Sequence, residues 1–358
     1  MSVSTQLELD ELLTLAAEKK ASDLHLSVGK PPVLRIDGKL VVLSDKETLT
    51  PDRCKELVLL LLNDKQKEIL SREREIDFSY NYKDLFRFRG NAFHERGRLS
   101  VALRLITKKI RTLEELNLPP ILERFVQVAQ GFVLMVGPAG CGKSTTLASL
   151  VDSINHTRTE HIITIEDPIE YIFEHDKSII DQREVYSDTL SFPRALRSVL
   201  REDPNVVLIG EMRDLETISA ALTIAETGHL VLATLHTNTA SQTVDRIIDA
   251  FPPYQQPQIR SQLASTITGV ISERLIPRIG GGRVPACEIM IANPAIRNLI
   301  REGKIYQVNS VIQTSGEKGM IPLDKSLATL VKEGAITKAD ALLWSVDGNL
   351  LESFLKEL

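Results

Sequence analysis

The chain has 358 residues, of which 43% are hydrophobic and 25% charged, a composition typical of soluble globular proteins. This length predicts two domains. With 43 basic and 48 acidic residues, the net charge of -5 excludes capture of nucleic acid or of an anionic membrane by a global positive field. Aromatic residues make up only 5% of the chain, which also disfavours a stacking surface for single-stranded nucleic acid.

Cysteine usage and apolar runs indicate the compartment. Cys54, Cys141 and Cys287 lie far apart, which leaves neither a framework of disulfides nor a paired-cysteine zinc site. Residues 1–10 lack the pattern of a secretory signal, and the longest apolar run, 57–62, is too short to cross a membrane. We therefore expect a cytoplasmic protein in a reducing compartment.

The first 110 residues predict a small α+β domain. Apolar spacing predicts helices over 5–20 and 51–70. Between them the period changes, and the pattern predicts short strands at 23–28, 32–36 and 40–43, the last two joined by a hairpin turn at Asp37-Gly38.

Two longer segments of this domain alternate strictly between apolar and polar residues. Strands are predicted at 85–93 and 99–106, and their polar face carries arginines that include Arg89 and Arg104. Residues 111–120 end in a double proline and are predicted to form a linker, so the first domain is expected to close near residue 110.

Residues 121–358 predict an α/β domain. Short apolar runs typical of buried parallel strands occur at 132–136, 162–165, 206–209 and 230–235. Helical segments separate them, and the chain is predicted to be helical from Asn293 onward, with Asn293 as N-cap and Gly303 as terminator of the first of these helices.

A phosphate-binding loop lies between the strand 132–136 and a predicted helix over 143–155. Its residues are Gly137, Pro138, Ala139, Gly140, Cys141, Gly142, Lys143, Ser144 and the following Thr145. The glycines allow backbone N–H groups to surround the β-phosphate, Lys143 supplies a charge for the β- and γ-phosphates, and Ser144 supplies a hydroxyl to Mg²⁺. Cys141 is interpreted as a spacer rather than a redox switch. The pattern predicts binding of ATP with Mg²⁺.

Acidic residues follow two of the apolar strands. The run 162–165 continues into a segment that ends at Glu170, and the run 206–209 continues through Gly210 into Glu211. Strand ends beside a phosphate-binding loop are where open parallel sheets bind ligands. Glu211 has the position of a Walker B acid, although aspartate is commoner there, and it is a candidate Mg²⁺ ligand together with Ser144.

Two histidines, His229 and His236, bracket the strand 230–235. Seven residues apart on an extended strand, their side chains would point to opposite faces, so they are poorly arranged to bind one metal ion. We expect at least one of them near the γ-phosphate and the other in a structural hydrogen bond.

These four segments, taken together, resemble the secretion ATPases of type II secretion and type IV pili, in the same order and spacing, over residues 5–340. The resemblance implies a PAS-like domain hinged to a RecA-like ATPase domain with C-terminal helices, assembled as a homo-hexamer. No four-cysteine zinc module is found, and Leu299-Ile300-Arg301-Glu302-Gly303-Lys304 is similar to a motif of the retraction branch of this family. From its residues alone, this segment predicts a capped surface helix.

The resemblance also implies roles for individual side chains. By this resemblance, Lys143 and Ser144 would hold the phosphates and Mg²⁺, and Glu211 would contact Mg²⁺ through water. Glu170 would orient the attacking water, and His229 would sense the γ-phosphate. Two arginine fingers, Arg89 and Arg104, would reach ATP.

The implied function is a Mg²⁺-dependent ATPase motor that drives pilus retraction and twitching motility. The implied partners are an inner-membrane platform protein, through which the motor would associate with the membrane, and a paralogous pilus ATPase. Two alternatives stay open from the sequence: an accessory that binds nucleotide but scarcely hydrolyses it, and a ring-shaped nucleic-acid translocase, which the negative charge disfavours.

Overall fold

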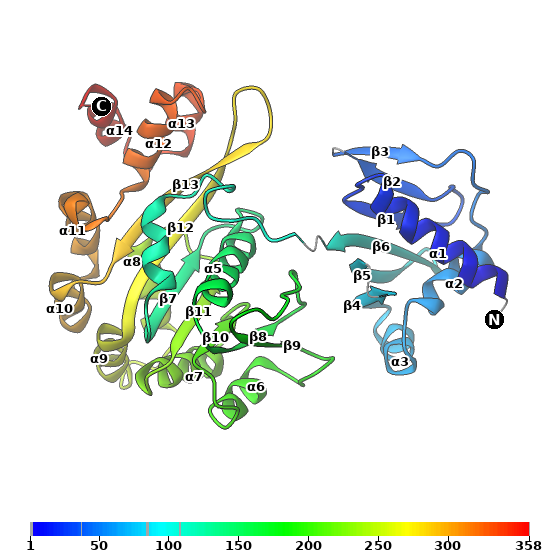
Figure 1. The fold of residues 1–358 in the computed structure, drawn as a ribbon, viewed down its shortest axis with the longest axis horizontal. Helices are drawn as coiled ribbons and strands as arrows, with labels where there is room; N and C mark the ends of the chain where they lie inside the picture. Colours follow the sequence, from blue (N-terminus) through cyan, green and yellow to red (C-terminus); the bar gives the residue numbers. More distant parts are fainter. Residues whose placement is uncertain (1–2, 37, 84–85, 107–108, 358) are drawn as a thin grey trace. The chain divides into compact units, whose positions relative to one another are not determined.

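The computed structural model describes residues 3–36, 38–83, 86–106 and 109–357. The chain divides into two compact units, Met1–Lys109 with Pro168–Ile172, and Ile110–Asp167 with Phe173–Leu358. Figure 1 labels helices and strands of each unit. The division after Lys109 falls next to the expected boundary, whereas nothing in the sequence indicated that residues 168–172 belong with the first unit.

The first unit contains a six-stranded sheet with the order β3-β2-β1-β6-β5-β4, in which all pairs are antiparallel. Its elements are α1 (Val3–Glu18), β1 (Asp23–Leu26), β2 (Val33–Ile36), β3 (Lys39–Val42), α2 (Pro51–Leu60), α3 (Asp64–Glu73), β4 (Glu75–Tyr82), β5 (Phe86–Glu95) and β6 (Arg98–Ile106). Its core packs α1 and α2 against the sheet through residues such as Leu12, Leu57, Phe88 and Leu103, because burying their apolar surface is the main favourable term in folding.

The helix predicted over 51–70 is wrong in one respect, since the structure has two helices there. Helix α2 ends at Leu60, and Asn63 is the N-cap of the next helix, α3. The Asn63 side chain accepts a hydrogen bond from the Gln66 backbone, and the Gln66 side chain accepts one from the Asn63 backbone. Strand β4 was not predicted. Asp37 of the predicted turn, Leu85 of the predicted strand and residues 107–108 lie outside the described residues.

The second unit contains a seven-stranded sheet with the order β13-β12-β7-β11-β10-β8-β9. Its first elements are η1 (Pro120–Leu122), α4 (Glu123–Val126), β7 (Gly131–Val136), α5 (Lys143–Thr157), β8 (His161–Glu166), β9 (Ile179–Glu184), α6 (Phe192–Val199), β10 (Val206–Ile209), α7 (Leu215–Glu226) and β11 (Leu230–Leu235). Strands β7, β11, β10 and β8 pair in parallel, so the predicted α/β class is confirmed.

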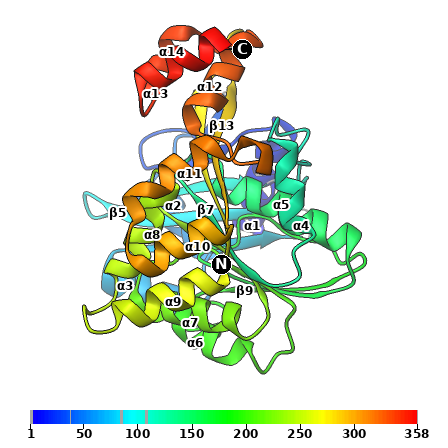
Figure 2. The same cartoon turned by 90° about the vertical axis from the view of Figure 1, so that its left-hand side faces the viewer.

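After β11 come α8 (Ala240–Asp249), α9 (Gln256–Thr266), β12 (Ile267–Pro277), β13 (Arg283–Ile291), α10 (Pro294–Glu302), η2 (Ile305–Gln307), α11 (Val308–Thr314), η3 (Gly316–Lys318), α12 (Leu323–Lys332), α13 (Lys338–Trp344) and α14 (Gly348–Glu357). Helices α12 to α14 gather beside the β12–β13 hairpin (Figure 2) and share a small core with it. Helix α10 has the predicted Asn293 cap and ends at Gly303 in the left-handed conformation.

Candidate nucleotide-binding site

The phosphate-binding loop joins β7 to α5 at the carboxyl end of the parallel strands. Gly137, Gly140 and Gly142 have φ of 143°, 73° and 107°, a region that side chains other than glycine rarely adopt. Gly142 is also the N-cap of α5, and the backbone N–H groups in the first turn of any helix point outward from its N-terminal end. The loop therefore has the geometry of an anion site at a helix N-terminus.

Lys143 is folded back over the loop. Its Nζ donates to the carbonyl oxygens of Gly137 at 2.8 Å and Pro138 at 2.9 Å, and its side chain is buried. Ser144 and Thr145 follow in the first turn of α5 and are half-buried. The sequence-predicted loop residues thus lie together between the end of β7 and the first turn of α5.

A chain of polar contacts connects the loop to the acid after β10. Lys143 Nζ lies 3.3 Å from Nδ1 of His236, and Nε2 of His236 lies 3.2 Å from Oε1 of Glu211. The other oxygen of Glu211 is 2.7 Å from Arg213. The side chains that follow β7, β11 and β10 therefore form one continuous chain of contacts. Because His236 contacts both Lys143 and Glu211, the orientation of its ring is fixed.

His236, rather than His229, lies beside the loop. In the parallel pairing of β11 with β7, Leu235 is opposite Val136 at the loop, whereas Leu230 is opposite Gly131 at the far edge of the sheet. His229 precedes Leu230, and its Nδ1 lies 3.0 Å from the Ile224 carbonyl. The assignment of the γ-phosphate role to His229 does not fit this placement, and His236 is the histidine that lies beside Lys143 of the loop.

Glu211 is suited to hold a cation. Burial alone would raise the pKa of its carboxyl, but hydrogen bonding and charge from Arg213, with a contribution from His236, lower that pKa below its usual value. The group is consequently ionised at neutral pH. Its carboxylate and the Ser144 hydroxyl are oxygen ligands of the kind that Mg²⁺ prefers, so the residues present fit this ion.

Strand β12, which was not predicted, pairs with β7 and carries residues that contact the loop and α5. Its residue Glu273 is buried, with 3% exposure, and accepts a hydrogen bond of 2.7 Å from Thr146 in α5. Arg283, at the start of β13, donates to the Gly140 carbonyl at 3.5 Å. Sequence reasoning missed both residues, because they lie more than 120 positions from the loop and no local motif marks them.

Cys141 is buried in the loop, with 4% exposure. Burial raises the pKa of its thiol even though the Lys143 charge lies close by, so the reactive thiolate is disfavoured. Cys54 and Cys287 are also buried free thiols. This agrees with the interpretation of Cys141 as a spacer.

The remaining candidate residues belong to the first unit. Arg89 and Arg104 are directly opposite each other on β5 and β6. Nη1 of Arg89 lies 3.7 Å from Oε1 of Glu170, and both side chains are more than 40% exposed. Arg104, which is 69% exposed, donates to Asp23 at 2.9 Å. The structure thus brings Arg89 together with the candidate water-orienting acid and provides Arg104 with an acidic partner of its own.

A family model described as "Type II/IV secretion system protein" matches residues 3–319. The chain belongs to this family. Among relatives of the Type II/IV secretion system protein family, the type IV pilus retractation ATPase PilT of Pseudomonas aeruginosa is 48% identical over 338 residues, which cover 94% of this chain and 97% of PilT. The type IV pilus ATPase PilU of the same organism is 39% identical over 351 residues, covering 98% and 92%.

Among solved structures, the crystal structure of the pilus retraction motor PilT with bound ADP superposes with a TM-score of 0.90 at 47% identity. The superposition covers 96% of this chain and 98% of that one, so the likeness extends over both units of the family fold. No helix in the described part of the chain is long and apolar enough to cross a membrane.

Proposed function

We propose that the protein is a Mg²⁺-dependent ATPase that works as a homo-hexameric motor and drives retraction of type IV pili. The observation that carries the proposal is the chain of contacts from Lys143 through His236 to Glu211. It joins a phosphate-binding loop to an ionised strand-end acid, the two parts that nucleotide hydrolysis requires. The full-length likeness to a pilus retraction ATPase supports the mechanical role.

In this proposal the backbone N–H groups of the loop bind the β-phosphate, and Lys143 leaves its carbonyl partners to neutralise the β- and γ-phosphates. Mg²⁺, when bound by Ser144 and by Glu211 through water, supplies further charge neutralisation. Glu170 orients the attacking water, and Arg89 and Arg104 stabilise negative charge that develops in the transition state.

Purified protein should hydrolyse ATP only with Mg²⁺, and both Lys143→Ala and Glu211→Gln should reduce turnover at least about a hundredfold. Matched controls are Lys177→Ala and Glu216→Gln, which change exposed residues of the same unit outside the loop motif and should retain wild-type turnover. Turnover like that of the wild type in either site variant would refute the site assignment.

Retraction is proposed over an accessory role. One organism carries two named pilus ATPases, PilT and PilU, and this chain is more similar to PilT, at 48% against 39% identity. The proposed partners are the inner-membrane platform protein of the pilus and a paralogous ATPase, contacted from the cytoplasm. Deletion of the gene should leave cells with excess surface pili and no twitching. Cells without pili would instead indicate an assembly motor, and unchanged twitching would indicate an accessory.

A further inference from the structure

One buried residue, Glu273, approaches both ends of the phosphate-binding loop, with its carboxyl at one end and its backbone carbonyl at the other. A Cβ at Gly142 would lie 2.2 Å from Oε1 of Glu273, and a Cβ at Gly137 would lie 2.4 Å from the Glu273 carbonyl oxygen. The first distance means that the carboxyl lies directly against the junction between loop and α5. At Gly137 the close atom belongs to the backbone, so glycine is required there by close approach as well as by its φ, whereas at Gly142 the φ of 107° is the main requirement.

The register of the sheet explains this placement. Ser272 on β12 is paired with Val136 on β7, so the next residue of each strand, Glu273 and Gly137, also lie side by side. The carboxyl then reaches beneath the loop to Thr146, whose hydroxyl donates to it at 2.7 Å. The side chain thus braces the first turn of α5.

The charge of this carboxyl is unusual for its position. Nucleotide phosphates are anions, and a carboxylate behind an anion site opposes their binding. Among the described residues, the groups that act electrostatically on Glu273 are Lys143, Cys141 and Cys287. Burial raises the pKa of both thiols, which leaves them neutral, so Lys143 is the one charge that acts on Glu273.

We infer that Glu273 is a positioning residue of the nucleotide site, which holds the loop through Thr146 and takes up a proton when nucleotide phosphates bind. The inference rests on the proposed function, because it assigns a role toward the nucleotide at the same loop. Glu273 does not contact the phosphates itself; it acts through the backbone of the loop and through the charge it places behind them.

The direction of the effect follows from the electrostatics. Burial raises the pKa of Glu273 to about 7, although the Thr146 hydrogen bond and the Lys143 charge each lower it. A bound polyphosphate adds negative charge nearby and draws Lys143 toward itself, and both changes raise this pKa further. Well below pH 7 the carboxyl is mostly neutral with or without nucleotide, whereas well above pH 7 binding takes up a proton, so affinity falls as pH rises.

The test compares ADP affinity of the wild type and Glu273→Gln between pH 6 and 8.5 by calorimetry. The amide keeps an oxygen that accepts from Thr146 but cannot ionise. One coupled proton changes affinity by at most about tenfold per pH unit. We expect similar affinities at pH 6, and about fivefold to tenfold weaker binding by the wild type than by Glu273→Gln at pH 8. The titration of ADP itself is common to both proteins and cancels in this ratio.

Glu288→Gln is the matched control. Glu288 is a second buried carboxyl on the same strand pair, but it accepts from the Ala240 backbone at the start of α8. This variant should retain the wild-type pH dependence. Thr146→Val, which removes a hydrogen bond that lowers the pKa of Glu273, should move the decline in affinity to higher pH.

Calorimetry at pH 7.5 in two buffers of different ionisation enthalpy should show more protons taken up per ADP by the wild type than by Glu273→Gln. Equal proton uptake, together with a wild-type to variant ratio that does not change with pH, would overturn the inference while leaving the proposed function intact. A wild type that binds no ADP at any pH would instead overturn the proposed function, and the inference with it.

Discussion

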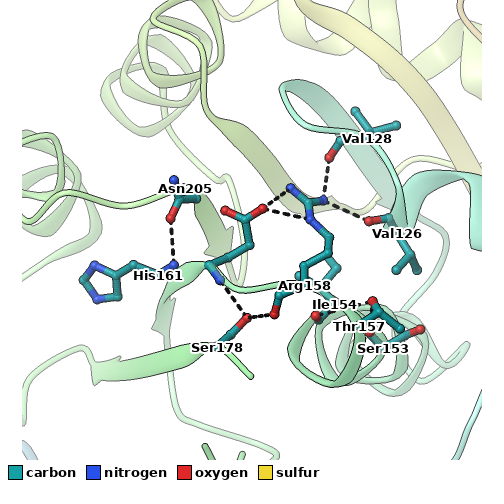
Figure 3. A network of polar contacts seen from close by, with 10 residues as sticks. Val126, Val128, Ser153, Ile154, Thr157, Arg158, His161, Ser178 and Asn205 are labelled. Atoms are coloured by element: carbon teal, nitrogen blue, oxygen red, sulfur yellow. Dashed lines mark hydrogen bonds and ion pairs between the residues drawn. The ribbon is translucent and has the colours of Figure 1, made fainter. Parts of the chain in front are cut away.

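The side chain of Arg158 should contribute strongly to the stability of the second unit. It lies between α5 and β8 and joins this connection to the end of α4: Nη1 donates to the carbonyl oxygens of Val126 at 2.9 Å and Val128 at 2.7 Å, and Nη2 lies 2.7 Å from Oε1 of Glu160. Figure 3 shows the Arg158 guanidinium with its contacts to the carbonyl oxygens of Val126 and Val128. Arg158→Ala removes all of these contacts at once.

The magnitude follows from burial. The side chains of Arg158 and Glu160 are only 14% and 19% exposed, so the substitution leaves a largely buried carboxylate without its cation. Breaking a buried ion pair costs about 3–5 kcal/mol. Since both groups retain some contact with water, we expect a loss at the lower end, about 3 kcal/mol. The free energy of unfolding falls by about 3 kcal/mol per M of urea in a unit of this size, so the urea concentration at the unfolding midpoint should fall by about 1 M.

The assay can report on this unit alone. Trp344, the one tryptophan in the sequence, lies in the second unit, so urea titration followed by its fluorescence monitors that unit. Arg197→Ala is the matched control, because the ion pair of Arg197 with Glu216 is 3.6 Å long with both side chains 68% exposed, and exposed pairs contribute little. A midpoint shift for Arg158→Ala no larger than that for Arg197→Ala would refute the reasoning.

Two further predictions concern the candidate site and the C-terminal helices. His236→Ala should lower ATP turnover at least about tenfold, because Lys143 and Glu211 lose their shared partner, whereas His229→Ala should change turnover less than about twofold. Phosphate release at saturating ATP measures the turnover of both variants. A larger loss with His229→Ala than with His236→Ala contradicts the assignment. Asn293→Ala removes the acceptor for the Ile296 N–H, 2.9 Å away, and should cost about 1 kcal/mol in a urea titration. Asn293→Ser keeps a capping oxygen and should retain most of that stability, so equal losses in both variants would argue against capping.

Local chemistry explains the features that could be predicted from the sequence. The phosphate-binding loop needs glycines, a lysine and a hydroxyl within eight residues, and the α10 boundaries need only Asn293 and Gly303. The buried parallel strands can be recognised in the sequence as continuous apolar runs, because both of their faces are covered in the fold. In each case the cause of the structure lies within a few residues of its effect.

The choice between the two histidines required more. Alternation along the strand predicts opposite faces for His229 and His236, but which of them lies near the loop depends on the direction of β11 relative to β7. The parallel pairing settles this, because the carboxyl ends of both strands then lie at one edge of the sheet, and His236 follows β11 as the loop follows β7. A resemblance assigned from motif order does not carry that information.

Strand β12 shows why the support of the site could not be predicted. Its middle residues Ser272, Glu273 and Arg274 form a polar run that, in isolation, is typical of a loop. Each is satisfied by a partner distant in sequence: Ser272 donates to the Asn238 carbonyl, Glu273 accepts from Thr146, and Arg274 donates to the Trp344 carbonyl. Buried polar groups persist only where such partners exist, so the strand is stable because the nucleotide loop, the segment after β11 and the C-terminal helices all meet it. The polar residues Glu273 and Arg274, which make β12 look like a loop in the sequence, therefore connect the nucleotide site to the helices at the end of the chain.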